Sequence, residues 1–189
     1  PHAVVKTDPQ GWQFPTERQI GIFLFLISLA LYLASMSWTP FPGLPTQALL
    51  AHLGGDVATG APDPLWGLLV RGFAHLPGLS VAAWAGLFSA VCGAMCVALL
   101  GRMMVRVGYL IRNEPGVNSF VREARARRIS GLAAGLYLAT CIPFWVVSTR
   151  SLPGAFHLLM LVAAAWGFSQ YQHWGRLRHL GLGGMLFGA

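Results

Sequence analysis

Uncharged, strongly apolar runs alternate along this chain with shorter polar stretches. A helix needs about 20 apolar residues to cross the hydrocarbon core of a bilayer, and most of these runs are close to that length. The predicted spans cover residues 20–38, 81–101, 129–149 and 154–169, with the start of a fifth at 180–189. The pattern therefore predicts an all-α, polytopic integral membrane protein.

Capping residues and prolines predict where two of these helices begin or bend. Thr16 follows Pro15 and precedes Gln19 by three residues, which is the reciprocal capping arrangement of a helix start. The first helix is therefore expected to begin near Glu17. Pro143 lies inside the third run and is expected to kink its outer end, because proline removes one backbone hydrogen bond.

The stretch 63–78, DPLWGLLVRGFAHLPG, is too short to span a bilayer, yet it has the pattern of an amphipathic helix. Asp63 followed by Pro64 is a favourable cap and first-turn pair. The apolar positions that share one helical face are Leu65, Leu68, Leu69, Gly72, Phe73 and Leu76. The stretch therefore predicts a short helix between two membrane spans.

This short helix, over residues 63–76, is expected to lie along the membrane surface. The stripe predicts that it docks through Leu65, Leu69 and Phe73, with Trp66 at the level of the lipid headgroups. Two roles remain open for it. It is either a packing lid over the spans or part of a substrate-binding surface.

Composition and charge agree with a membrane protein. Hydrophobic residues make up 55% of the chain and charged residues only 10%, well below the share typical of soluble domains. The formal net charge of +7 is concentrated in short connections between apolar runs. Membrane lipids with anionic headgroups are therefore the expected partners. No nucleic-acid binding is expected, because no basic run is interleaved with exposed aromatic residues.

The distribution of arginine predicts the orientation of the spans. The connection 102–128 contains seven arginines, whereas the connection 39–80 contains only Arg71. Short loops rich in lysine and arginine stay on the cytoplasmic side of a membrane. We therefore expect 102–128 to be a cytoplasmic loop and 39–80 to be an outer loop.

The same reasoning divides the chain into a cytoplasmic N-terminal segment, residues 1–18, and a transmembrane domain, residues 19–189. A cleaved signal peptide is the alternative for the first span, but its apolar run is longer than a signal core. The chain opens with Pro1 rather than methionine and stops inside an apolar run. We therefore expect it to be part of a longer protein.

Four segments, in this order along the chain, carry a family resemblance. They read AWAGLFSAVCGAMCVALLGRMM at 83–104, CIPFWVVSTR at 141–150, AFHLLMLVAAAW at 155–166 and LGGMLFGA at 182–189. With the arginine-rich loop and the outer surface helix, they resemble the N-terminal part of a bacterial family of membrane proteins related to protein O-mannosyltransferases. The resemblance extends over most of residues 19–189.

This resemblance implies a helical bundle of the GT-C type in the bacterial cytoplasmic (inner) membrane. Such glycosyltransferases use a polyprenyl-phosphate sugar as donor on the outer face of the membrane. No cofactor is evident in the sequence, and the resemblance leaves open a divalent cation bound with the donor. It also leaves open other membrane subunits as partners.

The acidic motifs that the resemblance implies are not matched. The first is expected in the outer loop, where this chain reads GLPTQ at 43–47, and the second between spans three and four, where it reads RSLPG at 150–154. Asp56 and Asp63 are the acids left in the outer loop. Asp56 is the first candidate for a general base toward an acceptor hydroxyl. Asp63 is the weaker candidate, because a role as helix cap explains it as well.

The other polar groups on the outer side form a second constellation. They are His52, Arg71, His75, Arg150 and His157. Guanidinium groups present several donors to phosphate oxygens, so these residues are candidates for binding a lipid phosphate or the donor. Pairing of the arginines with ordinary headgroups remains the alternative. Two function classes follow: a polyprenyl-phosphate-sugar glycosyltransferase, and a non-catalytic relative that acts as a lipid-binding or membrane-complex subunit.

The remaining features of the spans indicate packing rather than chemistry. Cys92, Cys96 and Cys141 lie inside spans with no histidine or carboxylate nearby in sequence, so no metal site is expected. Small residues recur every four positions in the second span, and Gly131 and Gly135 repeat this spacing in the third. Such seams let helices approach closely in lipid.

Cysteine labelling from outside the membrane tests the predicted orientation. In a variant without the native cysteines, a cysteine at Gly60 is expected to react with a membrane-impermeant maleimide, and one at Asn118 is expected to be protected until the membrane is permeabilised. The reverse pattern would contradict the orientation.

Overall fold

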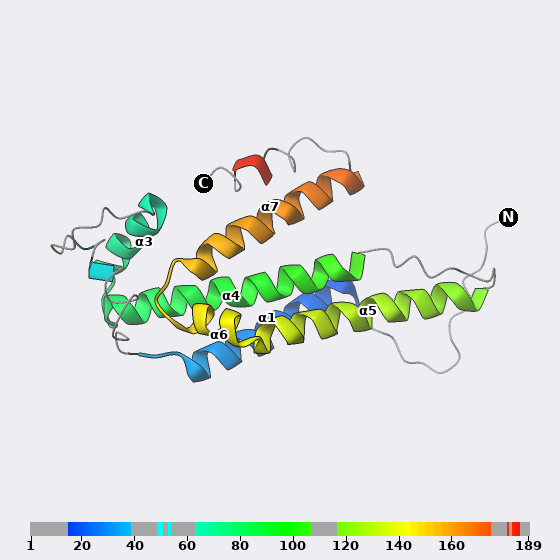
Figure 1. Ribbon diagram of the computed structural model, residues 1–189, viewed down its shortest axis with the longest axis horizontal. Helices are drawn as coiled ribbons and strands as arrows, with labels where there is room; N and C mark the ends of the chain where they lie inside the picture. Colours follow the sequence, from blue (N-terminus) through cyan, green and yellow to red (C-terminus); the bar gives the residue numbers. More distant parts are fainter. Residues whose placement is uncertain are drawn as a thin grey trace.

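The computed structural model of the 189-residue chain describes residues 15–38, 49–50, 53, 63–106, 117–174, 181 and 183–185. The main elements within these ranges are all α-helices (Figure 1). They are α1 (Glu17–Ser35), α3 (Pro64–Ala74), α4 (Val81–Arg106), α5 (Val117–Thr140), α6 (Ile142–Thr149) and α7 (Gly154–Trp174). The all-α prediction is confirmed for the described part of the chain.

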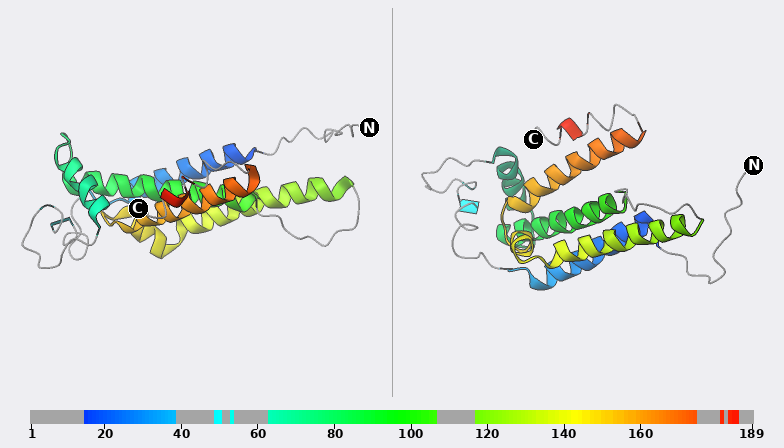
Figure 2. Two further views of the ribbon diagram at one scale, coloured as in Figure 1. Left: turned by 90° about the horizontal axis from the view of Figure 1, so that it is seen from above. Right: turned by 45° about the vertical axis from the view of Figure 1, so that its right-hand side comes forward.

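Helix α4 is the centre of the structure. Among the described helices, it is the one that contacts each of the others. Helices α1 and α5 run beside it over much of its length, α7 lies on another side, and the short α3 packs near its N-terminal end (Figures 1 and 2). Helix α4 therefore positions the other described helices.

The packing of α1, α4 and α5 depends on glycines. Leu24 of α1 is fully buried, and a Cβ added to Gly135 of α5 would lie 2.8 Å from one of its methyl carbons. A Cβ on Gly131 would lie 2.7 Å from the carbonyl oxygen of Gly101 in α4. Backbones can approach this closely in lipid only where side chains are small. The seam predicted at Gly131 and Gly135 is therefore confirmed.

The break between α5 and α6 confirms the predicted kink at Pro143. The segments Ala124–Thr140 and Ile142–Thr149 are bent by 64° relative to each other. Proline has no backbone N–H, so it cannot donate a helical bond to the carbonyl of Ala139, four residues earlier. The hydroxyl of the buried Tyr32 donates to that carbonyl at 3.2 Å. A side chain of α1 thus donates a hydrogen bond to the carbonyl that the proline leaves without a helical donor.

Two described helices, Glu17–Ser35 and Val81–Arg106, are long and apolar enough to cross a membrane, and the bent α5–α6 pair would be a third if it forms one span. The protein is therefore a membrane protein with transmembrane helices. Membrane crossing by residues 154–169 and 180–189, and the polytopic bundle as a whole, stay predictions.

The helix boundaries differ in part from the predicted ones. Helix α1 begins at Glu17 as expected, and the capping box is present, with Thr16 N–H donating to Gln19 Oε1 at 2.7 Å. Helix α4 continues beyond the predicted end at 101, and α5 begins at Val117, inside the predicted loop 102–128. Arginine is a good helix former, so a basic segment can extend a helix past the hydrocarbon region.

The short helix α3 exists as predicted, but its buried face differs from the predicted stripe. Trp66 and Val70 are fully buried, whereas Leu65 and Leu68 are 38% and 66% exposed. The expected docking through Leu65 is therefore wrong, and Trp66 packs inside the protein rather than on its surface. Its position at the level of the headgroups stays a prediction. Leu69 and Phe73 do pack against the core, as predicted. The largest aromatic side chain in the helix decides which face is buried, because it removes the most apolar surface from solvent or lipid contact.

A pair of identical substitutions tests the glycine seam. Gly131→Ala forces a Cβ against the backbone of α4 and is expected to destabilise the protein by about 1–3 kcal/mol. Gly72→Ala in α3, where a Cβ meets nothing within 4 Å, is expected to be neutral or to stabilise by up to about 1 kcal/mol. Unfolding in mixed detergent micelles measures both. Equal stability of the two variants would contradict the close approach of α4 and α5.

Candidate functional site

An acid and an imidazole meet at the end of the molecule where α4 begins. Nε2 of His157 lies 3.4 Å from Oδ1 of Asp63, and the two side chains are 49% and 27% exposed. Asp63 directly precedes α3, and His157 lies in the first turn of α7. These two residues, called the outer pair below, form an ion pair when the imidazole is protonated.

The structure corrects the expected role of Asp63 as a helix cap. Its side chain makes no capping hydrogen bond, although its backbone carbonyl accepts the first helical bond from Gly67 N–H at 2.9 Å. Pro64 occupies the first helical position and has no N–H to satisfy. The carboxylate is therefore available for the imidazole, because the start of α3 does not require it.

Four aromatic rings fix the geometry around the outer pair. The ring of Trp66 lies 6.0 Å from that of Phe88 in α4 and 6.2 Å from that of Phe156 in α7. Phe73 adds a contact with Phe88 at 5.6 Å between centroids. Aromatic pairs at these distances contribute beyond their buried area. Because Phe156 precedes His157 in the chain, the cluster holds both partners of the outer pair in place.

The other predicted site residues on the outer side do not join this pair in one described constellation. Arg71 is exposed in the last turn of α3, and His75 is exposed directly after that helix. Arg150 is half-buried after α6, and both arginines interact with other residues of the chain. His52 and Asp56 lie outside the described residues.

The turn at 150–154, where the resemblance implies an acidic motif, is attached to α4 by hydrogen bonds. The buried hydroxyl of Ser151 donates to the carbonyl of Ala82 at 2.9 Å. In the opposite direction, Ser89 Oγ donates to the carbonyl of Leu152 at 3.2 Å. These bonds give the turn a structural role between α6 and α7.

Neither the cysteines nor the other potential ligands form a metal site in the described part of the chain. No group of three or more histidine, cysteine, aspartate or glutamate side chains there is arranged to hold a metal ion. Cys92 and Cys96 are buried, Cys141 is partly buried, and all three are free thiols.

A second polar cluster lies at the opposite end of α4. Glu17 of α1 accepts from Arg102 Nε at 3.3 Å and from Arg106 Nε at 2.9 Å. Both guanidinium groups also stack on the ring of Trp166 in α7, at 4.7 and 4.4 Å from its centroid. This inner arginine cluster is not predicted from the sequence. Its one signal is that the two arginines lie one helical turn apart at the end of an apolar run.

Residues 48–178 match the family model described as the protein O-mannosyl-transferase TMEM260 N-terminal domain. The chain belongs to this family. The match covers more than half of the chain and includes both members of the outer pair. No curated protein matches the chain, and no solved structure matches it either. The predicted relation to protein O-mannosyltransferases is confirmed, whereas bacterial origin and the GT-C superfamily stay predictions.

Truncation of Trp66 tests whether the aromatic cluster holds α3 in place. Trp66→Ala removes a fully buried ring and is expected to cost about 3–5 kcal/mol of local packing, which releases α3 from α4. The rate of proteolytic cleavage within residues 63–80, in detergent, measures this release. Leu68→Ala, on the exposed face of the same helix, is the control and is expected to leave the rate unchanged. Equal cleavage rates in both variants would contradict the docking.

Proposed function

We propose that this protein is a membrane glycosyltransferase that transfers a sugar from a polyprenyl-phosphate donor to a hydroxyl acceptor on the outer face of a bacterial cytoplasmic membrane. Membership of the protein O-mannosyl-transferase family supports the reaction class. The transmembrane helices support a lipid-linked donor. The observation that carries the proposal is the outer pair. Among the described residues, it is the one contact between a carboxylate and an imidazole.

In the proposed reaction, His157 is the general base. Its Nε2 faces Asp63, so the tautomer with a proton on Nε2 leaves the lone pair of Nδ1 to accept the proton of the acceptor hydroxyl. The acceptor oxygen forms a bond to the anomeric carbon as the bond from that carbon to the phosphate oxygen breaks. Polyprenyl phosphate leaves with the bonding electrons. Asp63 orients the imidazole and stabilises the imidazolium that forms.

Binding of the donor phosphate is assigned to the basic residues of the outer side. Arg71 and Arg150 are the main candidates because a guanidinium group binds phosphate through a fork of donors, and His52 and His75 would add further donors. Asp56 remains the alternative base. Divalent cations such as Mg²⁺ prefer about six oxygen ligands, and the outer pair supplies one carboxylate. The proposed reaction therefore uses no metal ion.

A second candidate function is a non-catalytic lipid-binding or membrane-complex subunit. The turn at 150–154 favours it, because the position where the resemblance implies an acidic motif has a buried, hydrogen-bonded serine instead. A protein that keeps the phosphate-binding arginines but lacks a base would bind the donor without transferring the sugar. The two candidates therefore differ in one measurable property, which is turnover.

Sugar transfer in membranes, from a radiolabelled polyprenyl-phosphate sugar to acceptor, tests the outer pair. His157→Ala is expected to lower the rate by about 10²- to 10⁴-fold, because that is the usual contribution of a general base. Asp63→Asn is expected to cause a smaller loss, because the base remains but is less well oriented. Thr140→Ala is the control, since this exposed hydroxyl bonds only to carbonyls of its own helix, and it is expected to leave the rate unchanged.

Other outcomes of this experiment assign the function differently. Asp56→Asn is measured alongside these variants, and a loss confined to it would make Asp56 the base and remove the outer pair from the mechanism. Absence of transfer by the wild type, together with donor binding that depends on Arg71, would support the non-catalytic candidate.

A further inference from the structure

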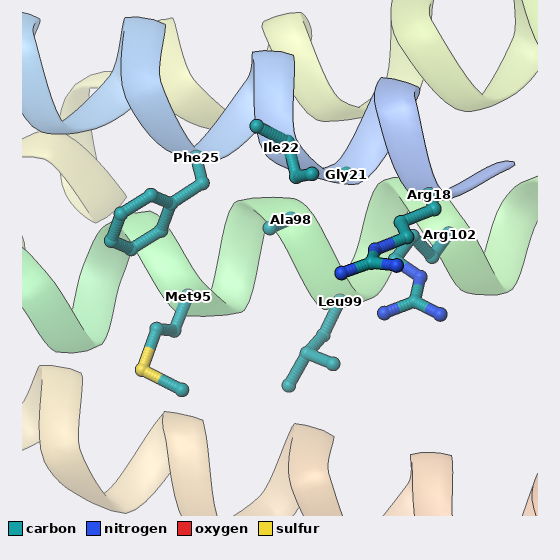
Figure 3. Close-up of a pocket in the computed structure, with 8 residues that line it drawn as sticks. All are labelled: Arg18, Gly21, Ile22, Phe25, Met95, Ala98, Leu99 and Arg102. Atoms are coloured by element: carbon teal, nitrogen blue, oxygen red, sulfur yellow. The ribbon is translucent and has the colours of Figure 1, made fainter. Parts of the chain in front are cut away.

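An open groove lies between α1 and α4, away from the outer pair. Its volume is about 400 Å³, within the range of small-molecule sites. Its walls are apolar over most of their length and include Phe25, Met95 and Leu99, whereas Arg18 and Arg102 lie together at one end (Figure 3). The groove therefore combines a long apolar surface with a positively charged mouth.

Among the described residues, the charged mouth has more positive than negative groups. Glu17 is shared between Arg102 and Arg106, and Nη1 of Arg106 is buried with no hydrogen-bond partner among the described residues. Arg18 is exposed, and no described residue forms an ion pair with it. Among the described residues near this end of α1 and α4, three guanidinium groups thus accompany one carboxylate. An anion at this mouth would be attracted by the charge that Glu17 does not neutralise.

A glycine directs the side chain of Arg102 toward the mouth. A Cβ added to Gly21 of α1 would lie 2.6 Å from Cδ of Arg102. The aliphatic part of the arginine therefore packs against α1 in the space that the missing side chain of Gly21 leaves. Arg18 and Arg102 both line this end of the groove (Figure 3). Guanidinium groups from two helices at one end of the groove provide donors that suit phosphate oxygens.

The position of the groove relative to the membrane defines its occupant. Both walls belong to helices long and apolar enough to span a bilayer, and Ile22 and Met95 are 50% and 41% exposed in the groove region. Arg18 and Arg102 lie at the ends of those helices, where arginine side chains reach the headgroups. The distance along α4 from its first residue to Arg102 is about 30 Å, at a rise of about 1.5 Å per residue.

We propose that this groove binds one phospholipid with an anionic headgroup. Its phosphate lies between Arg18 and Arg102, and one acyl chain lies along Phe25, Met95 and Leu99. The site goes beyond the proposed transfer reaction, because it lies at the end of α4 opposite the outer pair. With the orientation predicted from the arginine distribution, the bound lipid belongs to the cytoplasmic leaflet, whose surface is anionic.

Native mass spectrometry of the full chain in detergent, titrated with dioleoylphosphatidylglycerol or dioleoylphosphatidylcholine, tests the site. The wild type is expected to bind one phosphatidylglycerol at least tenfold more tightly than phosphatidylcholine. Arg18→Gln and Arg102→Gln are each expected to weaken phosphatidylglycerol binding about fivefold, the equivalent of about 1 kcal/mol per arginine at a membrane surface. Binding of phosphatidylcholine is expected to stay unchanged in both variants.

Arg125→Gln on α5 is the matched control, because it removes an exposed arginine outside the groove and is expected to leave lipid affinity unchanged. Ala98→Phe fills the groove between the walls and is expected to weaken binding of both lipids. If Arg102→Gln fails to fold, Arg18→Gln decides alone, since it breaks no described ion pair. Equal affinity of the wild type for the two lipids, full affinity in Arg18→Gln, or an equal loss in Arg125→Gln would overturn the proposal.

Discussion

The close approach of α1, α4 and α5 is the contact on which the rest of the structure depends. Leu24 fits against Gly135, and Gly131 meets the backbone of Gly101. In lipid there is little hydrophobic gain from bringing apolar helices together, so van der Waals contact at small residues must hold them. This seam sets the position of α4 relative to its neighbours, and a polar cluster lies near each end of α4.

Different interactions hold the neighbouring helices in place at the two ends of α4. At its start, Trp66 packs between rings from α4 and α7 and so holds Asp63 beside His157. At its end, Arg102 joins α4 to α1 through Glu17 and to α7 through stacking on an indole ring. Aromatic packing therefore supports the proposed reacting groups, and charge supports the proposed lipid site.

Local signals predicted the start of α1 and the bend between α5 and α6. The capping box at Thr16 and the kink at Pro143 each depend on residues within one helical turn, so the sequence shows them directly. The buried face of α3 was not predictable from its leucine stripe, because burial of Trp66 depends on rings from two distant helices. The outer pair joins segments far apart in the chain, and no local pattern indicates that Asp63 meets His157.

A double-mutant cycle on the transfer rate tests the central claim, that Asp63 acts in catalysis through His157. The rates of the wild type, Asp63→Asn, His157→Ala and the double variant are compared under the same conditions. The double variant is expected to be no slower than His157→Ala alone, because Asp63 has no imidazole left to orient. Losses that multiply in the double variant would contradict the claim, since they would show that the two residues act independently.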